Sequence, residues 1–113
     1  MRAIGTTTKE SESRIFAELV QQKLVRKLRR VDPQLPDLGV KTAPFVVLIG
    51  ARIPSVLAEV SFLTNEKDAR LLATDTYRAL VADALLEAIL DYRNVLKPTL
   101  PNETATSIAA ELN

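Results

Sequence analysis

Residues 45–49 read FVVLI and residues 56–63 read VLAEVSFL. Both runs are rich in apolar and β-branched residues, and Pro44 and Gly50 bound the first, which is typical of strands covered on both faces. Only the six residues 50–55 join them, whereas a parallel crossover normally needs about a dozen or more. The two strands are therefore expected to pair antiparallel or to be separated in the sheet.

Helical patterns flank these two runs. The segment before them has apolar residues at a helical spacing and ends at Asp32-Pro33. Its apolar positions are Phe16, Leu19, Val20, Leu24, Leu28 and Val31. After the strands, Asn65 is expected to cap a short helix that runs to Leu72, and Thr74-Asp75 opens a longer helix with apolar positions up to Tyr92. The order predicts an α/β fold with one helix before two strands and two helices after them.

The composition excludes several kinds of chemistry. With 113 residues the chain is one domain or part of one. It contains no Cys and no His, which excludes disulfides, thiolate nucleophiles, imidazole catalysis and Cys/His zinc sites. Its net charge of +1 provides no overall field to attract nucleic acid. We find no signal peptide at the start and no apolar run near the ~20 residues of a membrane span. We therefore expect no nucleic-acid or membrane partner, and a cytoplasmic location if the chain is made as written.

Glu59 is the candidate catalytic residue, because it is a carboxylate within the apolar run 56–63. In an apolar site a carboxylate costs several kcal/mol unless it is paired, binds a metal or faces a solvated cleft. The alternative is a glutamate at a strand edge that points to solvent, with Leu57 and Ser61 on its face.

A cluster of cations occupies the last turns of the first helix. It is either a solvated face stabilised by the helix dipole or a patch for an anionic partner. No aromatic residue is interleaved for base stacking, which argues against nucleic acid. The cluster comprises Lys23, Arg26, Lys27, Arg29 and Arg30.

Two motifs carry a resemblance. Residues 39–48 read GVKTAPFVVL and residues 53–65 read IPSVLAEVSFLTN. They resemble the zinc-dependent N-acetylmuramoyl-L-alanine amidases, bacterial cell-wall hydrolases with the pattern G-V-K, a strand of the type F-x-V-L, and M-P-[AS]-[VI]-L-[VA]-E-x-G-F-[LI]-[ST]-N. The resemblance covers residues 11–96, although Ser61 replaces the usual glycine and Leu38 replaces a frequent arginine.

The resemblance implies both a fold and a reaction. Residues 1–97 would be the C-terminal half of an amidase catalytic domain, part of a mixed sheet flanked by helices, with 1–12 as a poorly ordered lead-in and 98–113 as a flexible tail. The reaction would cleave the amide bond between the lactyl group of N-acetylmuramic acid and L-alanine in peptidoglycan. Zinc would activate the water, and Glu59 would be a buried, metal-facing general base. The parent family acts in the periplasm or cell envelope.

The missing histidines limit what this chain is expected to do alone. The family holds zinc with two histidines and a glutamate, all in the half that would precede Met1, so no residue here is assigned as a metal or cofactor ligand. We expect the chain alone to bind no zinc and to be inactive. Its expected partners are peptidoglycan through the complete domain, an upstream half, or a second copy through the open sheet edge. The alternative is a non-catalytic interaction module or remnant that pairs with another chain.

Overall fold

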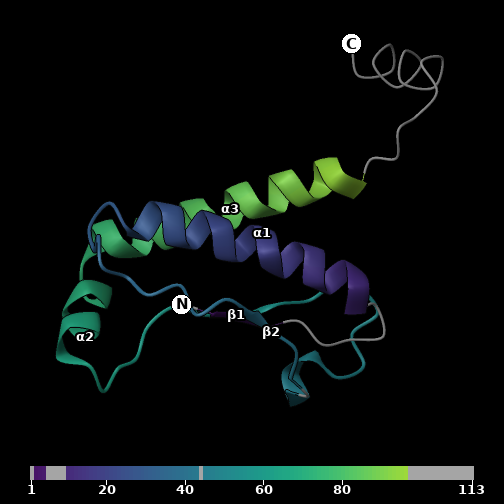
Figure 1. The fold of residues 1–113 in the computed structure, drawn as a ribbon, viewed down its shortest axis with the longest axis horizontal. Coiled ribbons are helices and arrows are strands. Elements are labelled where there is room, and N and C mark those ends of the chain that lie inside the picture. Colours follow the sequence, from purple (N-terminus) through teal and green to yellow (C-terminus); the bar gives the residue numbers. More distant parts are fainter. Residues whose placement is uncertain (1, 5–9, 44, 97–113) are drawn as a thin grey trace, which may run out of the picture.

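The computed structural model describes residues 2–4, 10–43 and 45–96, which form a small sheet with two long helices beside it (Figure 1). In the sheet, β1 (Arg2–Ile4) lies between β2 (Val40–Lys41) and β3 (Leu57–Glu59). It pairs parallel with β2 and antiparallel with β3. The α/β class and the mixed sheet flanked by helices are confirmed, and the described sheet has three strands where two were expected.

The core lies mainly between α1 (Glu10–Leu28) and α3 (Asp75–Leu96), which run side by side in opposite directions (Figure 1). Small residues on the facing sides, such as Ala17 and Ala84, let the two helices approach closely. Near the start of α1 the rings of Phe16 and Tyr92 pack with their centroids 4.9 Å apart. Both helices were predicted from the spacing of their apolar residues. The packing shows that this spacing marks the sides by which the two helices contact each other. The buried side chains of the pair include Ala17, Val20, Leu24, Leu28, Tyr77, Ala84 and Ala88.

The cations of α1 are largely used within the fold. Lys27 and Arg26 bind the two carboxylate oxygens of Glu87 on α3 at 3.0 and 3.1 Å. Lys23 binds Asp91 at 2.8 Å, one turn further along α3. The hydrogen bond from Lys27 is the main reason that the pKa of Glu87 is lowered. These residues therefore join the helices rather than present a patch to an anionic partner.

The short helix α2 (Glu66–Leu72) forms where its cap predicts. The Asn65 side chain accepts a hydrogen bond from the backbone N–H of Asp68 at 3.0 Å. At the start of α3 the Thr74 hydroxyl accepts one from the backbone N–H of Tyr77 at 3.2 Å. Both helix starts were predicted correctly, because a cap depends only on a few neighbouring residues.

The predicted strand at residues 45–49 is wrong. Val46–Leu48 instead form the short 3₁₀ helix η1, and Val46 and Val47 are 86% and 73% exposed. In the described sheet no strand lies beside this segment, so its N–H groups bond locally, for example from Leu48 to the Phe45 carbonyl at 2.9 Å. An apolar run becomes a strand only where a neighbouring strand completes its hydrogen bonds.

Two boundaries also differ from the expectation. Residues 1–12 were expected to be a poorly ordered lead-in, but Arg2–Ile4 form the central strand and α1 begins at Glu10. Ala3 and Ile4 are almost fully buried, which is why this segment is held in the sheet. The run 56–63 keeps strand geometry only over the three residues of β3. The tail predicted at 98–113 is outside the described residues.

Candidate active site

Glu59 is the last residue of β3, directly opposite Arg2 on β1. The Arg2 Nη1 atom lies 3.8 Å from the Glu59 Oε2 atom, and the Glu59 side chain is 42% exposed. In the described residues Glu59 is therefore not buried, which matches the alternative of a strand-edge glutamate that points to solvent. Because β3 is at the edge of the described sheet, the carboxylate reaches water while it remains paired across the strands.

Arg2 is a second member of this site, and the strand pattern of the sequence did not indicate it. Its side chain is 30% exposed at the ion pair, but its Nε atom is buried and has no hydrogen-bond partner among the described residues. Because the strands align Arg2 with Glu59, the guanidinium lies beside the carboxylate, and the Glu59 side chain stays partly exposed to solvent. An exposed ion pair of this kind contributes about 0–1 kcal/mol to stability, so its main effect is to position the carboxylate.

Hydrogen bonds to both long helices hold the chain on either side of β3. Before the strand, the Ser55 backbone N–H donates to the Ser13 hydroxyl of α1 at 3.0 Å. After it, the Ser61 and Tyr77 hydroxyls lie 3.4 Å apart. Ser61, which departs from the glycine of the amidase pattern, therefore has a structural partner on α3. Glu59 projects from a short strand that both helices fix in place.

The loop after β3 is held by α2. The Asp68 side chain accepts a hydrogen bond from the Phe62 backbone N–H at 3.0 Å. Lys67 pairs at 2.8 Å with Asp32, whose side chain is only 5% exposed. This ion pair links α2 to the segment that follows α1. The segments on either side of β3 are thus connected to α1, α2 and α3.

Tyr77 is the buried hydroxyl in this network, with 1% of its surface exposed. Its burial raises the pKa of the phenol above its usual 10.0; the hydrogen bond with Ser61 acts in the opposite direction, and the charges of Asp68 and Asp32 raise it further. The folded protein therefore keeps Tyr77 neutral at a pH where the unfolded chain begins to ionise.

This shift predicts how stability responds to alkaline pH. A raised pKa in the folded state gives stability that is complete below pH 10.0 and is lost as the pH rises beyond it. Tyr77→Phe removes the ionisable group, so its free energy of unfolding should fall less steeply above pH 10 than that of the unchanged chain. Urea unfolding at a series of pH values measures both slopes. If the unfolding free energies of the two proteins fell equally steeply above pH 10, the raised pKa of Tyr77 in the folded state would be contradicted. The pKa of Tyr92 is also raised by burial, so the double variant should be flatter still.

The side chains of this chain do not fit the zinc site that the resemblance implies. The sequence has no His or Cys, the nitrogen and sulfur donors that zinc sites in proteins use most. In the described ranges no group of three or more His, Cys, Asp or Glu is placed to hold a metal ion. What the site offers is the Glu59 carboxylate, which is partly exposed and lies 3.8 Å from the Arg2 guanidinium.

Comparisons with known proteins agree with the two motifs. A family model described as N-acetylmuramoyl-L-alanine amidase matches residues 3–91. The chain is 40% identical over 80 residues to an uncharacterized protein, YqiI, of Bacillus subtilis (strain 168), covering 71% of this chain and 36% of that protein. It is 38% identical over 82 residues to an uncharacterized cell wall amidase of Bacillus anthracis, covering 73% and 14%. It is 37% identical over 87 residues to the N-acetylmuramoyl-L-alanine amidase LytC of Bacillus subtilis (strain 168), covering 77% and 16%.

The chain matches these three relatives over only part of their length. It spans at most 36% of the length of these three relatives. No solved structure matches it. None of the helices in the described part of the chain has the length and apolar character needed to cross a membrane.

Proposed function

This chain belongs to the N-acetylmuramoyl-L-alanine amidase family, and from that membership we propose that it supplies the general base for peptidoglycan amide hydrolysis. The bond cleaved would join the lactyl group of N-acetylmuramic acid to the L-alanine of the stem peptide. The observation that carries the proposal is the family match over residues 3–91, which contains Glu59 within the motif at 53–65. The cell envelope, where peptidoglycan lies, would be the place of action.

In this proposal Glu59 moves the proton. It takes a proton from the attacking water as the water oxygen bonds to the lactyl carbonyl carbon. It then gives that proton to the nitrogen as the carbon–nitrogen bond breaks, so that L-alanine leaves as a free amine. The pairing with Arg2 at 3.8 Å and the exposure of the Glu59 side chain support this role, because a base must be both positioned and reachable.

The zinc ion of the family would have to be bound by residues outside this sequence. Because the donor set of this chain does not fit zinc, we propose that polypeptide other than these 113 residues supplies the ligands. The chain alone would then neither bind zinc tightly nor hydrolyse peptidoglycan. Peptidoglycan would bind to the completed domain.

A reconstitution experiment tests this proposal. The chain is incubated with purified peptidoglycan alone, and then together with the part of the LytC catalytic domain that precedes the segment matched here. We expect peptide release only from the mixture, and only when zinc is supplied. Chromatography and mass spectrometry of the soluble products would identify free L-alanine amino termini.

Two other outcomes would contradict the proposal. Release of peptide by the chain alone would reveal a catalytic site that does not depend on added ligands. A stable complex without hydrolysis would favour the second candidate, a non-catalytic interaction module. That candidate is supported by the outer edge of β3, which no described strand pairs, and by the exposed Ile53, Phe62 and Leu63 in the segments around it.

A further inference from the structure

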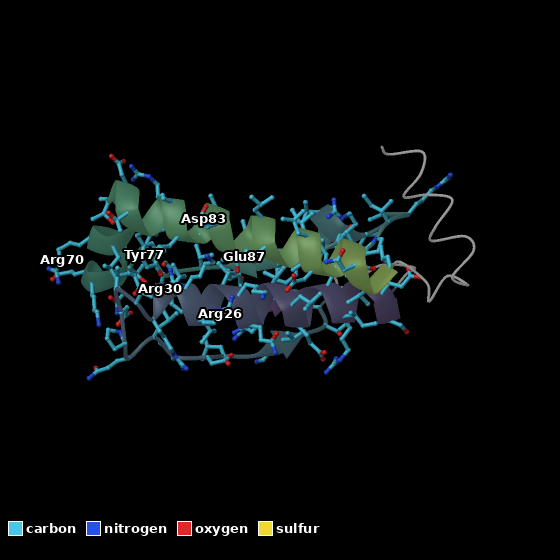
Figure 2. The ribbon with its side chains drawn as sticks, turned by 90° about the horizontal axis from the view of Figure 1, so that it is seen from above. Arg26, Arg30, Arg70, Tyr77, Asp83 and Glu87 are labelled. Atoms are coloured by element: carbon cyan, nitrogen blue, oxygen red, sulfur yellow. The ribbon has the colours of Figure 1, made fainter. Side chains whose placement is uncertain are left out.

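The outer face of α3 carries an apolar seam with a charge at each end. Leu86 and Leu90 are 55% and 38% exposed. Asp83 precedes them and Arg93 follows them, so the four residues are spaced three, four and three apart. This is the spacing by which one helix packs along another. Figure 2 shows Asp83 on the side of α3 away from α1, whereas Glu87 points toward α1.

The charges on this seam differ from the other charges of α3. Glu87 and Asp91 are paired with cations of α1. Asp83 and Arg93 are exposed, and neither makes an ion pair or a side-chain hydrogen bond with another residue in the part of the chain that the structure describes. The seam thus presents one unpaired anion, two exposed leucines and one unpaired cation in a row.

The seam is complementary to itself. Its members are symmetric about Ala88, because Asp83 and Arg93 are each five residues away and Leu86 and Leu90 are each two residues away. When the outer faces of two copies of α3 lie antiparallel, around a two-fold axis at the level of position 88 along the helix, each Asp83 faces the Arg93 of the other copy. Leu86 of each copy then faces Leu90 of the other. A parallel pair in register would instead oppose like charges.

We propose that the outer face of α3 is the contact surface of a homodimer, in which two copies of this chain pair antiparallel through Asp83, Leu86, Leu90 and Arg93. A two-fold contact requires that each residue meets its complement in the other copy, and the charge pattern meets that condition. A single pair of helices buries less surface than the roughly 1,600 Å² of a standard interface. The dimer is therefore weak and forms in a concentration-dependent manner.

Charge exchange tests the proposal in the purified chain. Sedimentation velocity over a range of concentrations gives the dimerisation constant. Asp83→Arg and Arg93→Asp each replace two attractions by two repulsions, so each variant alone should dimerise about tenfold more weakly. An equimolar mixture of the two variants should recover the affinity of the unchanged chain, because the mixed dimer again has two opposite-charge pairs. The double variant should recover it as well.

The same measurements can overturn the proposal. A chain that is monomeric at every concentration would do so. So would self-association that both single variants leave unchanged, because the contact would then lie on another surface, such as the open edge of β3. Leu86→Glu should abolish the dimer while far-ultraviolet circular dichroism stays unchanged, because this side chain is already exposed and glutamate is a good helix former. Retention of the dimer in Leu86→Glu would also reject the seam.

Discussion

Glu59→Gln is expected to lower peptide release by about 10²–10⁴-fold, the range in which general acid–base groups contribute. The experiment uses the completed domain, in which the preceding part of the LytC catalytic domain is fused ahead of residue 2 of this chain. Glutamine keeps the shape of the side chain but cannot take the proton from water. The loss should appear mainly in kcat, since Glu59 is proposed to act on the water and not to bind peptidoglycan.

Three measurements separate this role from others. Bound zinc, determined by elemental analysis of the fused domain, should be unchanged, and loss of zinc would mean that Glu59 is a ligand instead of a base. Thermal stability should change little, because the pair with Arg2 is exposed. Glu18→Gln is the matched control: Glu18 is an exposed glutamate of α1 that pairs with Arg14, and it should keep full activity. An active Glu59→Gln domain would reject the proposed base.

Arg2 is the residue of the same site that the sequence pattern did not indicate. Since it lies opposite Glu59 and 3.8 Å from it, it is a positioning residue for the carboxylate. Arg2 was not indicated because a strand pattern needs about four to eight alternating residues, and β1 has only three. The short apolar pair Ala3-Ile4 after a cation was the available signal.

The helices could be predicted from the sequence because their causes are local. Asn65 caps α2 through the backbone of Asp68, only three residues away. The apolar face of α3 follows from the spacing of the apolar residues within that helix, and α1 buries this face. The sequence did not indicate that Lys23 and Lys27 meet Asp91 and Glu87 across the helix pair, because such contacts depend on how two distant segments pack.

The sheet could not be predicted in the same way. Strand formation at 45–49 depends on a neighbouring strand, and in the described structure Val46 and Val47 are exposed in a 3₁₀ turn. The sequence singled out Glu59 because it is a carboxylate within an apolar run. Its exposure in the described residues matches the alternative of a strand-edge glutamate that points to solvent. The sequence could not decide between the two expectations, because burial depends on which element covers β3, and the described sheet ends there.

Leu24→Ala should cost about 2–5 kcal/mol of unfolding free energy, the range for removing a buried leucine. Leu24 is completely buried in the cluster between α1 and α3. The strands β1, β2 and β3 have only two or three residues each, and such short ladders add little stability by themselves. The helix pair must therefore hold the fold, and the loss would be a large share of the roughly 5–15 kcal/mol that keeps a small domain folded.

Leu63→Ala provides the matched control, since it makes the same chemical change at a side chain that is 78% exposed. Its effect should stay within about 0.5 kcal/mol. Urea unfolding followed by circular dichroism measures both variants at one protein concentration, low enough that self-association does not contribute. If the two variants were equally stable, the contact between α1 and α3 would not be the source of stability. The sheet or a partner chain would then have to supply it, because an unpacked amphipathic helix of this kind is marginal in water.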